Sequence, residues 1–378
     1  MSDETSFIPP YCPNAKCLHH KGFLKNGAFK SWRRKGFDRR KFSTPVLRFE
    51  CFYCKKNFCE RSFSINYRLK KTGHLNARIF FGVLHNRSNR SLSRQLKVSE
   101  CLVRTRIFRL ASAALCHHAS FIQDLKICEA VSYDGLEAFA KSQYEPNNIN
   151  QAVGQDSLYC YLFNFAPMNR KGRISMRQKR KLLCIEGDLG RFNPRAIRVA
   201  SAELFSDLVK MKHPSLERLH LCTDEHFQYR RAIEQDLSLE DSSQIYHQSV
   251  SSKATRNYKN ILFSVNHLDL LIRRKVAAFT RETICFSKKH SSMLHKYVLY
   301  ISYKNYMKPR FTKRHKKDPS SNTHSPAMKL GLVQKLLKFQ DIFARPIPST
   351  HMRTLPLAWE RLLKDEVLFH RDLKFCKA

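Results

Sequence analysis

Acidic residues are scarce in this chain of 378 residues. Asp and Glu number 31 against 69 Lys and Arg, which leaves a formal net charge of +38. A field of that sign concentrates polyanions, and contacts between basic side chains and phosphates release condensed counterions. The composition therefore favours a nucleic-acid partner, although a ribosome-associated or merely soluble basic protein would have the same balance.

Long apolar runs are also missing. No segment approaches the length of a membrane span, and Met1–Tyr11 lacks a secretory signal, so we expect no membrane partner. The 13 cysteines are an odd number scattered along the chain, which predicts reduced thiols in a cytoplasmic protein, some bound to metal and the rest in cores. A hydrophobic content of 42% argues against global disorder, and the length allows two or three domains.

Two cysteine pairs near the amino-terminal end predict a metal site. Four thiolates complete the tetrahedron that structural zinc requires, and short cysteine pairs on tight turns supply two ligands each. The first pair is spaced by four residues, and the second lies in a stretch typical of a ribbon hairpin, Phe49–Phe58. His19, His20 or Cys59 could replace one ligand, and the alternative is four unrelated thiols in a disordered arm. The predicted zinc ligands are Cys12, Cys17, Cys51 and Cys54.

Residues 91–115 have the pattern of a helix-turn-helix. Leu92 and Leu96 form one face of a short first helix, and Ser99 is suited to cap the second. Val103, Ile107, Leu110 and Ala114 share a face of that second helix. The exposed face suits the major groove of DNA, while an ordinary helical spacer is the alternative. The predicted DNA contacts on this face are Arg104, Thr105 and Arg109.

From Cys128 onward, short apolar runs alternate with helical stretches, which predicts an α/β domain around a mixed sheet. The expected strands are Glu129–Tyr133, Asn150–Gly154, Leu158–Ala166, Leu219–Thr223 and Gln244–Val250. The expected helices lie near Pro194–Lys212, Asp224–Asp236 and Val265–Thr280.

Two basic segments read as insertions in this domain. Met168–Lys181 and Lys304–Lys317 each hold seven basic residues and no acid. Such composition favours phosphate contact over a simple solvated loop. The predicted DNA contacts in the first segment are Arg170, Lys171, Arg173 and Arg177.

Two aspartates follow expected strands. Asp134 ends the run from Glu129, and Asp224 ends the run from Leu219. Paired carboxylates suit divalent cations, but Asp134-Gly135 is also a common turn pair, and Asp224 could merely cap the next helix.

The order of several short blocks resembles bacterial insertion-sequence transposases. The leading cysteine pairs and helix-turn-helix pattern fit the same family, and the likeness runs from about Cys12 to Gly331. The blocks are Tyr133–Phe139, Ser142–Tyr144, Asn150–Gly154, Thr223–His226, Leu262–Arg273, Arg281–Lys288 and Ser325–Gly331.

The resemblance implies an RNase H-like catalytic domain in which carboxylates on adjacent strands and a late helix hold two Mg²⁺ ions for strand cleavage and transfer. Asp134 and Asp224 match the first two acids. Where relatives often have glutamate this chain has Asn266, with Asp269 one turn later. The family position favours Asn266 and the charge of a carboxylate favours Asp269, and we expect Asn266 to complete the site with Asp269 as its neighbour or substitute. Arg273 shares their helical stripe and is a predicted DNA contact, or it pairs with Asp269.

The implied organisation has four parts: a DNA-binding zinc ribbon (1–75), a helix-turn-helix (76–127), an RNase H-like domain with a basic insertion at 168–193 (128–312), and a basic linker with a helical tail (313–378). The implied partners are double-stranded DNA, as terminal inverted repeats and target, and further copies of the chain in a dimer or higher oligomer. The implied location is the bacterial cytoplasm, beside the nucleoid. A DNA-binding regulator that no longer cuts, and an RNase H-like nuclease without strand transfer, are the alternatives.

Overall fold

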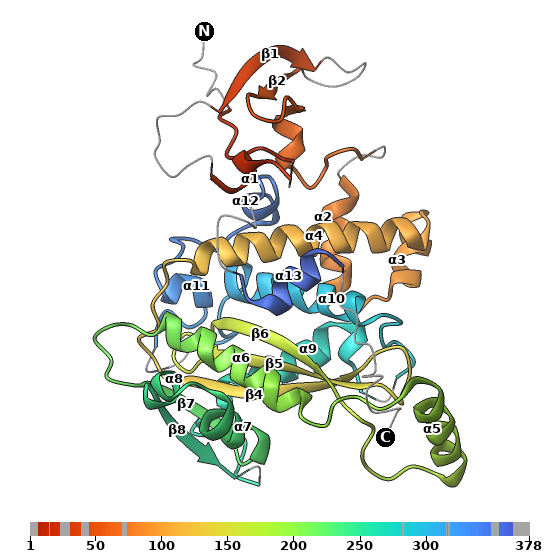
Figure 1. Ribbon diagram of the computed structural model, residues 1–378, viewed down its shortest axis with the longest axis vertical. Helices are drawn as coiled ribbons and strands as arrows, with labels where there is room; N and C mark the ends of the chain where they lie inside the picture. The colour runs from red at the N-terminus through yellow and green to blue at the C-terminus, as the bar shows by residue number, and fades with distance from the viewer. Residues whose placement is uncertain are drawn as a thin grey trace.

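The chain folds as a mixed α/β protein, with a small β unit at one end and a five-stranded sheet at the other (Figure 1). The computed structural model describes residues 7–14, 16–22, 31–38, 45–69, 74–251, 253–281, 283–314, 316, 318–348 and 355–365. His315 and Lys317, two members of the second basic segment, lie outside these residues, as do residues 349–354 and 366–378 of the predicted tail.

The amino-terminal unit is an antiparallel sheet of β1 (Trp32–Asp38), β2 (Val46–Cys51) and β3 (Asn57–Cys59). The short helix α1 (Leu18–Gly22) precedes it and the 3-10 helix η1 (Glu60–Phe63) follows. The predicted hairpin is confirmed, because Phe49 pairs with Phe58 across β2 and β3. This unit has a small core of its own, built from Tyr11, Cys12, Cys17, Phe49, Cys51, Phe58 and Phe63.

Three helices follow: α2 (His74–Leu84), α3 (Asn89–Leu96) and α4 (Glu100–Ile122). The predicted cap is confirmed, since the Ser99 hydroxyl accepts a hydrogen bond from the Leu102 amide at 3.2 Å. The predicted apolar face of α4 is buried as expected, from Val103 through Ala114. α2, α3 and α4 pack on one another.

The five-stranded sheet has the order β6-β5-β4-β7-β8. β4 runs antiparallel to β5, and β5 antiparallel to β6, whereas β4, β7 and β8 are parallel. All five expected strands are present with shifted bounds. They are β4 (Val131–Phe139), β5 (Pro146–Gly154), β6 (Cys160–Pro167), β7 (Leu219–Asp224) and β8 (Ile245–Val250).

The expectation that Asp134 ends its strand is wrong. β4 continues to Phe139 because β5 pairs with it along its whole length, and Asp134 lies opposite Gln151 in mid-strand. The Asp134-Gly135 pair is therefore part of the sheet and makes no turn. Gly135 is needed there, because a Cβ at this position would collide with the side chain of Asn148 on β5.

Helices cover both faces of the sheet. The Tyr133 hydroxyl donates to the Ser201 hydroxyl of α6 (Ala196–Met211) at 2.7 Å, so α6 lies on one face. The other face carries α9 (Phe263–Lys275), the 3-10 turn η3 (Ala277–Phe279) and α10 (His290–Ser302), which runs into the π-helical turn η4 (Tyr303–Met307). The helix expected at Asp224–Asp236 begins later, as α7 (Phe227–Arg231), and continues as the π-helical turn η2 (Ala232–Asp236).

The basic insertion 168–193 extends from the body as α5 (Met176–Leu189), which buries none of its residues (Figure 1). α8 (Leu239–Ser243) precedes β8. In the tail, α11 (Pro326–Lys329), α12 (Phe339–Phe343) and α13 (Leu357–Leu363) are short. Trp359 of α13 is fully buried, and its indole N–H donates to the Phe163 carbonyl at 2.8 Å.

One contiguous hydrophobic core joins α2–α4, the sheet and the described part of the tail. The helices predicted as a separate unit therefore share their core with the predicted catalytic domain. Among the described residues, no helix has both the length and the apolar character needed to cross a membrane.

Candidate functional site

The first cluster is formed by the four predicted cysteines. Cys12, Cys17, Cys51 and Cys54 place their sulfurs within 4.8 Å of one another. The Cys12–Cys54 and Cys17–Cys51 Sγ distances are 3.6 and 3.7 Å. A tetrahedron with Zn–S bonds of about 2.3 Å has edges of about 3.8 Å, so these two distances match the edges of a structural zinc site.

Local turns bring these cysteines together. The Cys17 amide donates to the Asn14 carbonyl at 2.9 Å, and the Lys55 amide donates to the Cys51 carbonyl at 3.0 Å, with Lys55 at a positive φ of 57°. Burial raises the pKa of the Cys12 thiol, and neighbouring thiols add to the rise. A cation would offset the cost of ionising thiols packed this closely.

The proposed substitutes for a cysteine have other contacts. His20 Nδ1 lies 2.5 Å from the Cys12 carbonyl oxygen, and His19 Nδ1 lies 3.6 Å from Cys51 Sγ, just outside the four sulfurs. Cys59 lies at the end of β3 and forms a 3.9 Å contact with the Ser62 hydroxyl. The cluster is thus the four-cysteine set.

The second cluster is acidic and begins with the register of β4 and β7. Ser132 pairs with Cys222 in these parallel strands, and Asp134 and Asp224 each lie two residues beyond that pair. Because side chains alternate along a strand, the contact of Tyr133 with α6 directs Asp134 to the opposite face, where α9 packs. Both aspartates are half-buried.

A third carboxylate, Asp269 of α9, is held at the site by Gln151 of β5. Gln151 lies opposite Asp134 in the ladder of β4 and β5, and its side-chain amide Nε2 donates to Asp269 Oδ1 at 2.5 Å. The Tyr297 hydroxyl of α10 donates to the side-chain oxygen Oε1 of Gln151 at 2.8 Å. Gln151 is completely buried, so both of its hydrogen bonds are protected from water and fix Asp269 over the sheet.

The electrostatics agree with this convergence. Burial, together with the charges of Asp224 and Asp269, raises the pKa of Asp134 to about 7. Burial also raises the pKa of Asp269 to about 6, against the lowering effects of the Gln151 hydrogen bond and Arg273. Burial is therefore the main cause of both shifts, and repulsion between the carboxylates adds to the shift of Asp134.

Asp224 also has a local structural role. Its Oδ1 accepts a hydrogen bond from the His226 amide at 3.0 Å, and His226 in turn caps α7. One carboxylate oxygen thus holds the turn after β7. The predicted cap is confirmed in part, and the second oxygen has no hydrogen bond within the part of the chain that the structure describes.

The predicted stripe on α9 is confirmed as a half-buried row of Asn266, Asp269 and Arg273 beside the buried Val265, Leu268 and Ile272. Arg273 donates to the Glu137 carbonyl at 3.0 Å. Among the ion pairs of the described residues, none joins Asp269 to Arg273. The expected side-chain pair at this spacing is therefore not formed.

The predicted DNA contacts on α4 differ in exposure. Arg104 and Thr105 are exposed, and the Thr105 hydroxyl donates back to the Cys101 carbonyl at 2.9 Å. Arg109 is half-buried, and its guanidinium donates to the Tyr67 carbonyl at 2.5 Å. Arg109 thus ties α4 to the segment that follows the small β unit, which leaves Arg104 and Thr105 as the accessible pair.

The predicted contacts of the insertion lie just before α5 and in its first turn. Lys171, Arg173 and Arg177 are exposed. Arg170 is half-buried, with its guanidinium 5.3 Å from the centroid of the Phe139 ring at the end of β4. This contact fixes the start of the insertion to the strand that carries Asp134.

Sequence reasoning missed Gln151 and Tyr297. Gln151 was quoted only as part of a resemblance block, although a glutamine inside a buried strand is itself a signal, since a buried amide needs partners. Tyr297 gives no such signal, because a tyrosine on an apolar helix is ordinary core.

Comparison of the chain with protein-family models, curated proteins and solved structures found no match.

Proposed function

We propose that this protein is a DNA transposase that cleaves and transfers DNA strands at the acid site between β4, β7 and α9. One observation carries the proposal. Asp134 and Asp224 hold equivalent positions on adjacent parallel strands, and Asp269 is fixed beside them by Gln151, the cross-strand partner of Asp134. The resemblance to RNase H-like transposases implies this arrangement, with carboxylates on neighbouring strands and on a late helix.

The donor set fits Mg²⁺, which takes oxygen ligands and is bound through few carboxylates. Asp134 and Asp224 would hold the ions from the sheet, and Asp269 or the Asn266 amide oxygen from α9. The raised pKa of Asp134 supports this, since a bound cation would offset the cost of ionising a buried carboxylate beside two others. When bound, Mg²⁺ activates the attacking hydroxyl and stabilises the leaving oxygen at phosphorus.

The remaining side chains suit a phosphate substrate. Arg273 is anchored to the Glu137 carbonyl through one nitrogen, which leaves other N–H groups to bind a phosphate oxygen. Arg256 and Arg281 lie close enough to lower the pKa of Asp269 and are exposed at the rim of the site. Gln151 acts as a positioning residue, because it orients Asp269 and touches no substrate.

The amino-terminal half supplies DNA recognition in this proposal. α3 and α4 act as a helix-turn-helix, with Arg104 and Thr105 facing the groove, and the four cysteines hold zinc in a ribbon. The exposed Lys and Arg side chains of α5 bind the phosphate backbone of element ends or target DNA. A dimer or larger assembly would bring two inverted repeats together.

The test uses the DNA that flanks this reading frame as the substrate, because an element's ends lie there. We expect Mg²⁺-dependent cleavage by the wild type and its loss in Asp134→Asn, Asp224→Asn and Asp269→Asn, with DNA binding retained. Asn266→Ala tests the alternative ligand on α9. The matched control is Asp124→Asn, which removes an exposed carboxylate just after α4.

Three outcomes separate the candidate functions. Cleavage without joining products would indicate a nuclease that lacks strand transfer. Specific binding with no cleavage at any Mg²⁺ concentration would indicate a DNA-binding regulator. Equal cleavage by the wild type and the Asp134→Asn variant would disprove the assignment of the acid site.

A further inference from the structure

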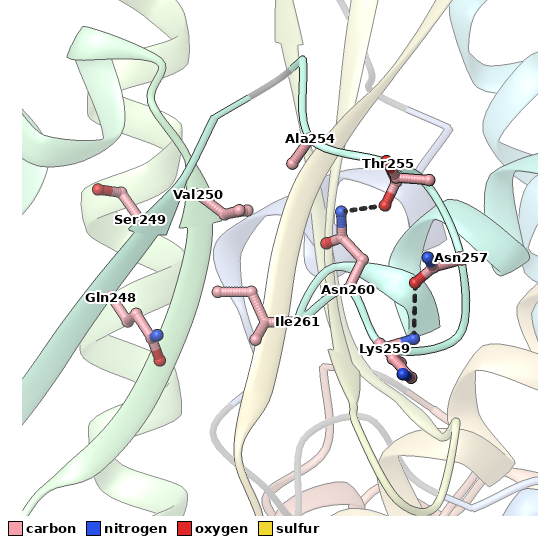
Figure 2. Close-up of a pocket in the computed structure, with 9 residues that line it drawn as sticks. All are labelled: Gln248, Ser249, Val250, Ala254, Thr255, Asn257, Lys259, Asn260 and Ile261. Atoms are coloured by element: carbon pink, nitrogen blue, oxygen red, sulfur yellow. Dashed lines mark hydrogen bonds between the residues drawn. The ribbon is translucent and has the colours of Figure 1, made fainter.

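A pocket lies beside the acid site, between the end of β8 and the loop that leads to α9. Its volume is about 260 Å³. Figure 2 shows the residues that line it, which come from the strand and from the loop: Gln248, Ser249, Val250, Ala254, Thr255, Asn257, Lys259, Asn260 and Ile261.

Hydrogen bonds connect this pocket to the strands that carry the aspartates. Val250 of its wall is paired with Asp224 in the parallel ladder of β7 and β8. The Ile261 carbonyl, on the opposite side, accepts a hydrogen bond from the Ser132 hydroxyl at 2.5 Å. Ser132 is two residues before Asp134 and on the same face of β4. The pocket is therefore held at a fixed position next to the carboxylates.

Two asparagines stabilise the loop. The Asn260 amide group donates to the Thr255 carbonyl at 3.0 Å, and its oxygen accepts from the Leu262 amide at 2.8 Å. The Asn257 oxygen accepts from the Lys259 amide at 2.9 Å, as drawn in Figure 2. The Asn257 amino group has no partner among the described residues. The loop thus has a defined shape and an available hydrogen-bond donor.

The lining combines an apolar wall with a polar rim. Val250, Ala254 and Ile261 supply the wall, and Asn257 and Lys259 lie at the rim (Figure 2). A volume slightly below that of typical small-molecule sites fits a single planar ring system with one polar edge. A nucleobase has these properties, because its faces are apolar and its edge carries donors and acceptors.

Charge and aromatic exposure around the pocket favour a nucleic-acid strand. Residues 251–262 contain Lys253, Arg256 and Lys259 and no acid. Tyr258 does not line the pocket itself, but it lies between the lining residues Asn257 and Lys259 and leaves 70% of its surface exposed. Exposed aromatic rings interleaved with basic side chains are the usual means of binding unpaired strands, through stacking on bases and contact with phosphates.

We propose that this pocket receives one unstacked nucleotide of the DNA strand that enters the acid site. The base packs on the apolar wall and against Tyr258, its edge meets the Asn257 amino group, and Lys259 and Arg256 bind the adjacent phosphates. The inference rests on the proposed function for the choice of DNA as the ligand. Its test measures binding alone and does not depend on cleavage.

The experiment compares two forked duplexes without added Mg²⁺, one with an ordinary single-stranded flap and one with an abasic flap. The full chain is titrated against each by fluorescence anisotropy, and a 2-aminopurine in the ordinary flap reports stacking. We expect the abasic flap to bind between about fivefold and about a hundredfold more weakly, as the loss of one stacked base implies.

Two variants locate this preference in the pocket. Tyr258→Ala removes the stacking ring, and Ala254→Leu fills the wall, so each is expected to bring the affinity ratio of the two flaps towards one. Tyr246→Ala is the matched control, because it removes a tyrosine of similar exposure, 54%, that lies on β8 and not in the loop of Tyr258. It should leave the ratio unchanged.

Equal binding of the two flaps by the wild type overturns the proposal, as does a ratio that neither pocket variant changes. Competition by micromolar free deoxynucleoside monophosphate would also overturn it, because the ligand would then be a free nucleotide. A base-dependent ratio in a protein that never cleaves DNA would retain the pocket and reject the transposase. DNA cleavage by a protein that binds both flaps equally would support the transposase and reject the pocket.

Discussion

Asp134 lies half-buried beside two further carboxylates, so its ionisation opposes folding when no Mg²⁺ is bound. Burial, together with Asp224 and Asp269, raises its pKa from 3.8 to about 7. A group whose folded pKa is raised stabilises the fold fully below its unfolded pKa, and this stability is lost as pH rises through the folded pKa. The contribution of Asp134 is therefore present near pH 4 and gone above pH 7.

The size of the effect follows from the shift. A difference of about three pKa units corresponds to about 4 kcal/mol, at about 1.4 kcal/mol for each unit. Partial exposure of the side chain to water reduces this, so we expect about 2 kcal/mol. Asp134→Asn keeps the shape of the side chain and removes its ionisation. The variant should therefore be more stable than the wild type by about 2 kcal/mol at pH 8 and nearly equal to it at pH 4.

The two tryptophans provide the assay. Trp32 lies in the small β unit, whereas Trp359 is fully buried in the main core, so a Trp32→Phe background makes fluorescence report on the sheet domain alone. Urea unfolding at several pH values then gives the free energy of unfolding for each variant. Asp124→Asn serves as the control for removal of an exposed carboxylate.

Added Mg²⁺ provides the second half of this test. It should stabilise the wild type, because binding to the folded state alone shifts the unfolding equilibrium, and it should do much less for Asp134→Asn. Two results would refute the argument: an Asp134→Asn variant no more stable than the wild type at pH 8, or a difference that fails to shrink on acidification.

Three further predictions concern the rest of the molecule. Elemental analysis should find about one zinc per chain, and a zinc-free wild type would contradict this. The Cys51→Ser variant should lose the zinc and bind DNA more weakly, while the unfolding transition reported by Trp359 stays unchanged. Arg104→Ala should weaken DNA binding and lower its salt dependence, measured by titration at several salt concentrations, whereas an unchanged affinity would remove α4 from the interface. Gly135→Ala should destabilise the fold by about 1–3 kcal/mol in urea unfolding, because its Cβ collides with the buried Asn148, while Gly187→Ala, which meets nothing within 4 Å, should be neutral or stabilising.

The sequence predicted most of the fold because its apolar periodicity is strong. Runs such as Leu158–Ala166 and the Val265, Leu268 and Ile272 arc reveal their elements without any knowledge of neighbours. Strand ends were less predictable. Asp134-Gly135 has the local chemistry of a turn, and only the complete antiparallel ladder with β5 keeps it in the sheet. The end of β4 was therefore set by its pairing with β5 and not by the local turn preference of Asp134-Gly135.

The candidate site was predictable in its acids and not in how they are held. Asp134 and Asp224 stood out because each follows an apolar run, and the resemblance to transposases paired them as site residues. Asn266 and Asp269 share one helical stripe, and the family position led us to prefer Asn266 over Asp269. The hydrogen bond from Gln151 now gives Asp269 a fixed place beside Asp134, whereas Asn266 offers a neutral oxygen one turn earlier. This geometry depends on a contact between residues 118 positions apart, which no local pattern encodes.

The shared core has a consequence for how DNA recognition and cleavage would be coordinated. α4 has 23 residues, which gives it a length of about 35 Å. Its amino-terminal turns expose Arg104 and Thr105, whereas most of its carboxyl-terminal half is buried, and the helix packs on α10. α10 in turn carries Tyr297, which holds Gln151 and, through it, Asp269. DNA bound at the start of α4 would therefore lie at a set distance from the acids, fixed by packed helices and with no flexible linker between them. The distance from the recognised sequence to the cut would then be set by the packing of this core. Cavity-forming substitutions at the α4–α10 contact should therefore broaden the range of cleavage positions while DNA binding is still retained.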